Sequence, residues 1–368
     1  MTSTSEADGI LPAEEITALL DRGVIDAPHP LGDAQIQPAS MDLRLGTTAY
    51  RVRASFLPGP GTHVGDRLQD ITTHRIDLRD GAVLETGCVY VVPLQEALSL
   101  PEGLAAATNP KSSTGRLDVF TRVISDGCSA FDQIADGYNG PLYAEICPQT
   151  FPIVVRPGSR LSQIRFRRGV VESDDKELRA LHETHGLVSS GEPDIASGIA
   201  VSVDLSGDEN QLIGYRAKRH TGVVDVDRPA SCRVADYWEP VRADAGKTLI
   251  LDPDQFYILA SKEAVHVPPS HAAEMVPFNP LVGEFRVHYA GFFDPGFGHD
   301  AAGGGGSRAV LEVRSHKVPF ILEDSQIIGR LIYERMAAVP ETLYGAGLSS
   351  NYQGQGLKLS KHFVGDIG

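Results

Sequence analysis

An internal repeat is the feature that most constrains the fold of this sequence. The run YVVPLQEALSLP at residues 90–101 lines up with YILASKEAVHVP at residues 257–268. The same spacing of 167 positions takes Glu145, in LYAEI, to Glu312, in VLEVR. Upstream, SMDL recurs as SVDL at a slightly shorter spacing. Self-similarity at a fixed period is the signature of a duplicated structural unit, so we predict two copies of one domain.

Each copy has the sequence pattern of β structure. Runs such as CVYVVPL, FPIVVRPG, TLILDP and FYILAS are rich in β-branched and aromatic residues and are too short for buried helices. One helix is expected between Pro12 and Gly23, where acidic residues follow the proline and apolar residues form one face. A second, polar helix is expected at residues 174–186. We predict a mainly β protein with a few short helices, with an N-terminal domain over residues 1–186 and its repeat over residues 187–368.

Composition narrows the classes of function. A net charge of −15 and a pI near 5.2 argue against broad nucleic-acid binding, which requires a basic face. No run reaches the roughly 20 apolar residues that span a membrane, and the start MTSTSEADG lacks the regions of a signal peptide, so we expect a cytoplasmic protein. The histidines of HETH at residues 182–185 are spaced by three, which is typical of a solvated helix surface and not of HExxH zinc ligands. The cysteines form no CxxC pair and are expected to be buried thiols: Cys88, Cys128, Cys147 and Cys232.

The segment NPKSSTGRLDVF at residues 109–120 gathers hydroxyl groups and two cations in one short loop. Such a loop can present backbone N–H groups, hydroxyls and positive charge to an anion. Taken alone, the same composition is equally typical of an ordinary serine-rich turn. A small anionic ligand is compatible with an acidic protein, because a few cations in a cleft outweigh a distributed negative charge.

Several motifs together resemble the dCTP deaminases of the trimeric dUTPase-like superfamily. They are IQPASMDLRLG at 36–46, PKSSTGR at 110–116, GYNGPLYAEI at 137–146 and RPGSRLSQIRF at 156–166. The C-terminal LYGAGLSSNYQGQ, at 343–355, resembles the nucleotide-covering tail of that family. The resemblance covers nearly the whole chain once the duplication is allowed. It implies two tandem dUTPase-like domains of β-barrel or jelly-roll-like form, and the hydrolytic deamination of dCTP to dUTP and ammonia.

The resemblance assigns roles to individual residues. Glu145 would move protons between water, the cytosine ring and the departing ammonia, as a carboxyl group with a pKa near working pH can. Ser112 would hold the attacking water, and Arg116 would stabilise developing charge. On periodicity alone Glu145 could instead face water, because strands alternate. Substrate-binding roles carry over to Lys111, Ser113, Thr114, Gly115, Asp136, Asp294, Tyr344 and Gln355.

The two copies are unequally preserved, which leaves two arrangements of the site open. The second copy lacks the serine pair, but it keeps the hairpin HYAGFFDPGFG, in which Asp294 is expected to contact the deoxyribose 3′-hydroxyl. In the first copy Ala135 takes that position and Asp136 follows it. Either the first copy supplies the whole site, with Glu145 as the acid, or the site is composite and Glu312 is the acid. The GxxxxE spacing kept before Glu145 favours the first arrangement slightly.

The resemblance also implies cofactors and partners. We expect Mg²⁺ held by the triphosphate without protein ligands, no zinc, a homotrimer, and dTTP as a candidate inhibitor. The reaction has two rivals: dUTP diphosphatase or combined deaminase and diphosphatase activity, and a nucleotide-binding regulator without catalysis.

Overall fold

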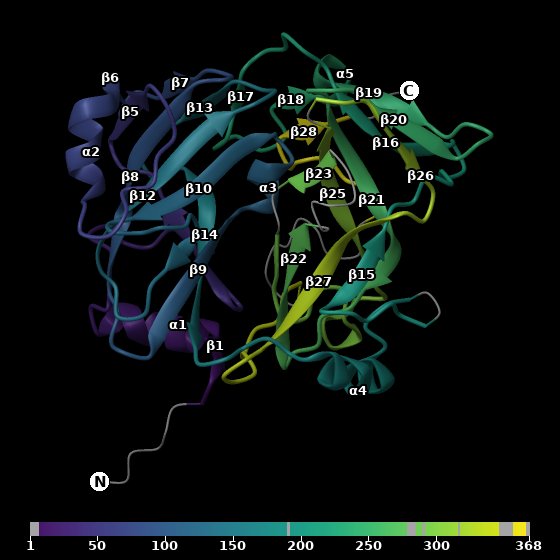
Figure 1. Cartoon of the computed structure of the whole chain (residues 1–368), viewed down its shortest axis with the longest axis horizontal. Coiled ribbons are helices and arrows are strands. Elements are labelled where there is room, and N and C mark those ends of the chain that lie inside the picture. Colours follow the sequence, from purple (N-terminus) through teal and green to yellow (C-terminus); the bar gives the residue numbers. More distant parts are fainter. Residues whose placement is uncertain are drawn as a thin grey trace.

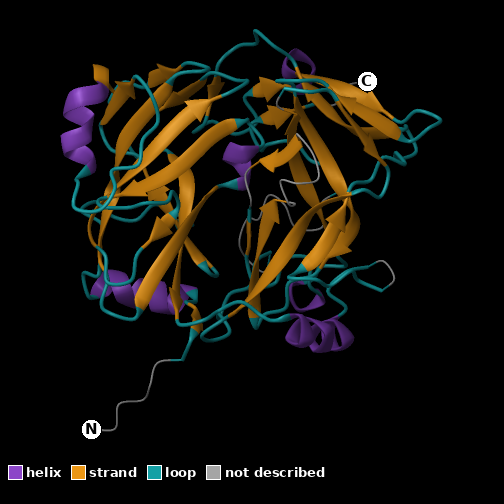
Figure 2. Ribbon diagram, in the orientation of Figure 1, coloured by secondary structure: helices purple, strands orange, loops and turns teal. Residues whose placement is uncertain are grey.

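The computed structural model describes residues 7–189, 192–277, 285–288, 291–315, 317–345 and 356–365. Its strands form two β units that lie side by side (Figure 1), and most of the helices lie at the edges of these units (Figure 2). The predicted class, mainly β with a few short helices, is therefore confirmed.

The first unit is built from two sheets, each of six strands within the described residues 7–168. One sheet has the order β11-β9-β14-β4-β3, with β1 beside β14, and the other has the order β10-β12-β8-β5-β6, with β2 beside β8. A short β7 pairs with β13. The bounds are β1 Gly9–Ile10, β2 Ile25–Asp26, β3 Ile36–Gln37, β4 Ser40–Arg44, β5 Thr48–Val52, β6 Thr72–Asp77, β7 Ala82–Leu84, β8 Val89–Ser99, β9 Leu104–Pro110, β10 Val119–Ser125, β11 Gln133–Ile134, β12 Asn139–Pro148, β13 Ile153–Val155 and β14 Arg160–Arg168.

The second unit follows the same plan. Its sheets have the orders β15-β27-β22-β24 and β19-β16-β21-β25-β23, so β27 lies between β22 and β15 as β14 lies between β9 and β4. Glu145 on β12 and Glu312 on β25 occupy corresponding strands. The bounds are β15 Ile199–Ser202, β16 Leu212–Ala217, β17 Val224–Asp225, β18 Cys232–Arg233, β19 Trp238–Arg242, β20 Thr248–Leu251, β21 Phe256–Val265, β22 His271–Pro277, β23 Phe285–His288, β24 Phe292–Phe293, β25 Ser307–Ser315, β26 Phe320–Glu323, β27 Ile327–Arg335 and β28 Phe363–Val364.

Two of the helices, α1 and α4, form where the sequence predicts them. α1 (Ala13–Asp21) begins after Pro12 and buries Ile16 and Leu19. α4 (Asp175–His185) begins with a capping box at Asp174, which satisfies backbone N–H groups of the first turn. Three further helices are α2 Val64–Ile71, α3 Ser112–Gly115 and α5 Val234–Tyr237, with a 3-10 turn at Asp300–Ala302. No helix in the described part of the chain has the length and apolarity needed to cross a bilayer.

One hydrophobic core runs from the first unit into the second and fixes their contact. The ring of Phe151, beside β13, lies 5.3 Å from that of Trp238 and 5.5 Å from that of Tyr237. Strand β17 of the second unit also pairs with β13 of the first. Edge-to-face aromatic pairs of this kind add to the free energy gained by burying the rings. Of the cysteines predicted to be buried, Cys147 and Cys232 are buried, whereas Cys88 and Cys128 are half-buried.

Candidate active site

The serine-rich segment forms a compact turn at the seam between the two units. Strand β9 ends at Pro110, and α3 follows immediately. The N–H group of Thr114 donates to the carbonyl of Lys111 at 2.8 Å, and the Thr114 hydroxyl donates to the carbonyl of Leu161 at 2.9 Å. Thr114 and Gly115 are therefore held inside the turn, while Ser112 and Ser113 line the adjoining cavity.

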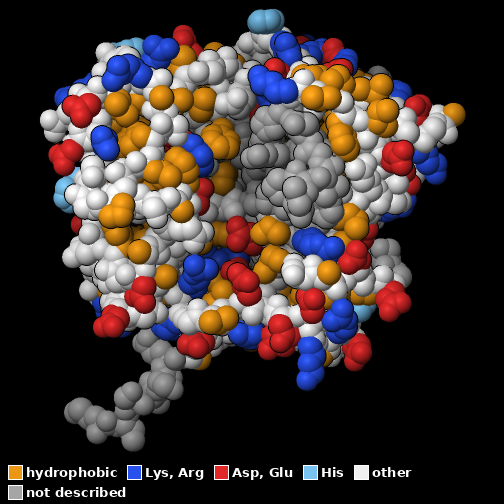
Figure 3. Space-filling model, viewed as in Figure 1, with side chains coloured by type: hydrophobic (Ala, Val, Ile, Leu, Met, Phe, Trp, Pro, Cys, Tyr) orange, Lys and Arg blue, Asp and Glu red, His pale blue; other side chains and the backbone are white. Residues whose placement is uncertain are grey.

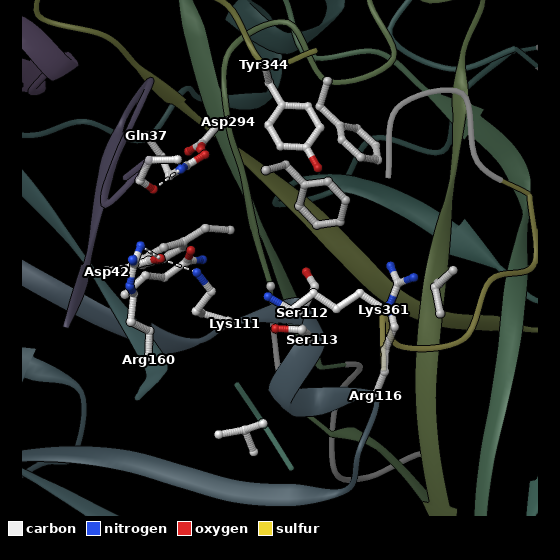
Figure 4. Close-up of a pocket in the computed structure, with 18 of the residues that line it drawn as sticks. Gln37, Asp42, Lys111, Ser112, Ser113, Arg116, Arg160, Asp294, Tyr344 and Lys361 are labelled. Atoms are coloured by element: carbon white, nitrogen blue, oxygen red, sulfur yellow. Dashed lines mark hydrogen bonds and ion pairs between the residues drawn. The ribbon is translucent and has the colours of Figure 1, made fainter. Parts of the chain in front are cut away.

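This cavity has a volume of about 480 Å³ and takes its walls from both units. A volume of this size is in the range of pockets for small molecules. Figure 4 shows Asp42, Lys111 and Arg160 grouped together, Arg116 beyond the two serines, and Tyr344 on the opposite wall. The first unit contributes Lys111, Ser112, Ser113, Arg116 and Arg160, and the second contributes Asp294, Glu312 and Tyr344, with Lys361 from the C-terminal segment.

Arg116 and Glu312 meet across the seam inside this cavity. The Nε atom of Arg116 lies 3.9 Å from Oε1 of Glu312, and both side chains are less than a tenth exposed. Burial raises the pKa of Glu312 from its ordinary value to about 8, against the opposing effect of the Arg116 guanidinium. A carboxyl group with this pKa can both accept and donate a proton near neutral pH.

Glu145, the acid that the sequence favoured slightly, lies elsewhere. It is buried on β12 opposite Arg122 of β10, and the Nε atom of Arg122 donates to its Oε1 at 3.2 Å. The Arg122 guanidinium also stacks over the ring of Phe131, 3.4 Å from its centroid. Among the residues described, the cavity wall does not include Glu145. The structure thus brings Arg116 together with Glu312 and leaves Glu145 paired within its own sheet.

Asp294 and Tyr344 both line the cavity. The carboxylate of Asp294 accepts a hydrogen bond from Nη2 of the buried Arg165 at 3.2 Å. Burial raises the pKa of Asp294, and Arg165 acts against that shift. The ring of Tyr344 packs 5.7 Å from that of Phe297.

Three predicted substrate residues are not part of the described cavity wall: Thr114 and Gly115, which are held inside the turn, and Asp136. Asp136 is exposed and accepts a hydrogen bond from the N–H group of Gly103 at 2.7 Å, so it closes a surface turn. Its assignment rested on a local shift in the alignment of the two copies, and the structure places it away from the cavity wall formed by the described residues. Gln355 lies outside the described residues.

The cavity also contains charged residues to which the sequence analysis gave no role. The carboxylate of Asp42 pairs with the ammonium group of Lys111 and lies 3.6 Å from Nη1 of Arg160. Asp42 belongs to the SMDL motif that recurs in the second copy, and Arg160 belongs to the conspicuous run RPGSRLSQIRF. These two motifs could have identified both residues as candidates from the sequence. Lys361 carried no such signal, because its place depends on how the C-terminal segment folds back.

The arrangement therefore has a cationic end and a proton-transfer end. Lys111 and Arg160 offer positive charge for an anion, and Arg116 with Glu312 offers a guanidinium beside a protonatable carboxyl. On the face shown in Figure 3, acidic and basic side chains are otherwise interspersed. The described residues contain no group of three or more His, Cys, Asp or Glu placed to hold a metal ion.

Comparison with known proteins identifies a consistent set of relatives. The model of the 2′-deoxycytidine 5′-triphosphate deaminase N-terminal domain matches residues 7–170, and that of the C-terminal domain matches residues 174–363. A crystal structure of 2′-deoxycytidine 5′-triphosphate deaminase from Agrobacterium tumefaciens is 62% identical, with a TM-score of 0.87, over 91% of this chain and 100% of that one. The dCTP deaminase of Halorubrum lacusprofundi is 27% identical over 56% of this chain and 98% of its own length. A Salinispora tropica protein named dCTP deaminase, dUMP-forming, is 30% identical over 42% of this chain and 77% of its own.

Proposed function

The chain belongs to the 2′-deoxycytidine 5′-triphosphate (dCTP) deaminase family, and from this premise we propose that it is an enzyme that hydrolyses dCTP to dUTP and ammonia. The observation that supports this most directly is the approach of Arg116 to Glu312 at 3.9 Å in a cavity shared by the two units.

In the proposed reaction Glu312 is the group that moves protons. Ionised Glu312 takes a proton from water as the water oxygen bonds to C4 of the cytosine ring. Protonated Glu312 gives this proton to ring N3 as C4 becomes tetrahedral. Glu312 then takes the proton of the new hydroxyl group at C4 and passes it to the amino nitrogen, so that the bond from C4 to that nitrogen breaks, the C4=O bond forms and ammonia leaves. Proton transfer by a positioned side chain contributes roughly 10²–10⁴ in rate. The raised pKa of Glu312, about 8, supports both halves of this cycle near neutral pH.

Neighbouring residues complete the proposal. Arg116 stabilises the charge that develops on the ring, because its guanidinium is held beside Glu312 and its Nη1 donates to the carbonyl of Lys358 at 2.9 Å. Ser112 positions the water, and Ser113 and Lys111 bind phosphate oxygens at the cationic end.

Mg²⁺ would accompany the substrate, held by the triphosphate and without protein ligands. The carboxylate at the cationic end, Asp42, is engaged by Lys111 and Arg160, so triphosphate and water oxygens would supply the ligands of the ion. When bound, the ion neutralises part of the phosphate charge.

Release of diphosphate from dUTP is the second candidate activity, because the Salinispora tropica relative is named as dUMP-forming. One assay separates the alternatives. Purified protein is given dCTP and Mg²⁺, and ammonia and pyrophosphate are both measured. Ammonia without pyrophosphate supports the single reaction, equal amounts support the combined reaction, and no ammonia contradicts the proposal.

Assembly and regulation are proposed from the resemblance described above. Because Arg116 and Glu312 belong to the same chain, this pair forms without a second copy. We propose a homotrimer, to be checked by light scattering, and inhibition by dTTP, to be checked by adding dTTP to the ammonia assay.

A further inference from the structure

The C-terminal segment at residues 356–365 returns to the serine turn of the first unit. The hydroxyl of Ser360 donates to the carbonyl of Ser113 at 2.8 Å. Arg116 donates to the carbonyl of Lys358 in the same segment. Two residues of the candidate site are thus tied to a stretch of chain more than two hundred positions away.

The other side of the segment is anchored on the second unit. Strand β28 pairs in parallel with β18, and the N–H group of Ala230 donates to the carbonyl of Lys361 at 2.9 Å. The ring of His362 lies with Nε2 2.9 Å from the carbonyl oxygen of Val226. Ser360 and His362 are each 2% exposed. The backbone of Lys361 is therefore fixed between two buried neighbours, and its side chain is presented from a rigid position.

The side chain of Lys361 enters the cavity at its cationic end, together with Lys111 and Arg160. Figure 4 shows it beside Ser112 and Ser113. Burial lowers the pKa of Lys361, and the positive charges of Lys111 and Arg160 lower it further, while Asp42 and Asp227 act in the opposite direction. The Asp42 carboxylate offsets part of the repulsion among these three cations, and a bound anion would offset more of it.

We infer that Lys361 binds the 5′-triphosphate of the nucleotide, as a third cation beside Lys111 and Arg160 that the C-terminal segment delivers to the site. The inference rests on the proposed function for the identity of the nucleotide. Its consequence is that the segment is a wall of the phosphate site, and that Lys361 sets the preference for a triphosphate over shorter phosphate chains.

The test compares Lys361→Gln with Lys317→Gln, which removes one positive charge from an exposed position outside the cavity wall. The kcat and KM of ammonia release are measured with dCTP and with dCMP. In Lys361→Gln we expect the KM for dCTP to rise about 10- to 100-fold, the range for losing a hydrogen bond to a charged group, with kcat nearly unchanged. The KM for dCMP should change much less, Lys361→Arg should recover part of the loss, and Lys317→Gln should match the unsubstituted protein.

Three results would overturn the inference. They are an unchanged KM for dCTP, equal changes for dCTP and dCMP, and a lowered melting temperature that accounts for the loss. Direct titration with inorganic tripolyphosphate separates this inference from the proposed function. If the unsubstituted protein releases no ammonia from dCTP, the function fails, yet weaker tripolyphosphate binding by Lys361→Gln would still support the role of Lys361, and equal binding would contradict it.

Discussion

Asp118 and Arg314 form a buried ion pair across the seam, and each lies two residues beyond a member of the Arg116 and Glu312 pair. Nη2 of Arg314 also donates to the hydroxyl of Thr150 at 2.9 Å. The turn that bears Arg116 and the strand that bears Glu312 are therefore joined by two successive charged contacts. This relationship fixes the alignment of the two units where the proposed proton transfer takes place.

Replacing Asp118 by Asn should shift the pH profile of the enzyme. Burial is the main cause of the raised pKa of Glu312, and the negative charge of Asp118 adds to it. Without that charge the pKa of Glu312 falls, so the rising limb of kcat/KM against pH should move to lower pH. Loss of the ion pair should also lower the free energy of unfolding by about 1–3 kcal/mol, the cost of an unsatisfied buried polar group. Glu239→Gln, in an exposed pair with Arg216, is the control and should leave the profile in place.

The two candidate acids should respond differently to removal of charge. Glu312→Gln should lower kcat for ammonia release about 10²–10⁴-fold, because the amide cannot take up the proton of water. Glu145→Gln should keep most of the activity, since Glu145 pairs with Arg122 outside the cavity wall. Ammonia release by each variant at saturating dCTP is the measurement. Loss of activity in Glu145→Gln alone would restore the first copy as the catalytic one, and full activity in both would refute the mechanism.

The stability of the protein should also depend on pH through Glu312. The folded chain holds this carboxyl with a pKa of about 8, well above the ordinary 4.5, so the folded state binds more protons between those values. The free energy of unfolding should therefore fall as pH rises from about 4.5 to about 8. Glu312→Gln removes this contribution, so the variant should gain stability relative to the unsubstituted protein across that window.

Urea denaturation of both proteins at pH 5, 6.5 and 8 checks this dependence. Glu274 and Asp132, whose pKa values burial raises to about 7 and about 6, titrate in both proteins and cancel in the difference. A difference in unfolding free energy that stays constant with pH would contradict the raised pKa of Glu312.

Much of the fold follows from local sequence, whereas the choice of acid does not. The positions of α1 and α4 follow from residues such as Pro12 and Asp174, which set helix ends through nearby backbone groups. Glu145 and Glu312 occupy corresponding strands, and the one local difference between them, the GxxxxE spacing before Glu145, does not report which acid lies beside Arg116. Packing between the two units is what brings Glu312, and not Glu145, beside Arg116, because it places the turn with Arg116 against β25.

The positions of Asp136 and Lys361 also depend on contacts that local sequence patterns do not reveal. Asp136 was chosen by aligning the two hairpins, yet its carboxylate is used by the turn at Gly103. Lys361 lies far along the chain from the serine turn, and its place depends on the hydrogen bond of Ser360 and on the core around Trp238. Contacts between segments so distant in sequence are set by tertiary packing, which short motifs do not encode.

Arg165 is buried, and we expect its loss to lower the unfolding free energy more than the loss of an exposed arginine. Its guanidinium is 1% exposed, lies over the ring of Phe292 and donates to Glu334 at 2.7 Å and to Asp294 at 3.2 Å. Because it reaches from β14 of the first unit into the second, Arg165→Met leaves two buried carboxylates without their cation. The expected loss is about 3–5 kcal/mol of unfolding free energy, with a raised KM for dCTP because Asp294 loses its orientation. Arg165→Lys keeps the charge without the planar fork, so its loss of unfolding free energy should be smaller than that of Arg165→Met but still measurable.

The control is Arg216→Met, which removes an arginine from a pair whose side chains are 44% and 45% exposed. This substitution should lower the unfolding free energy by only about 0–1 kcal/mol. Urea denaturation and dCTP kinetics of the three variants are the measurements. Equal losses of unfolding free energy in Arg165→Met and Arg216→Met would contradict a stabilising role for the buried contacts of Arg165.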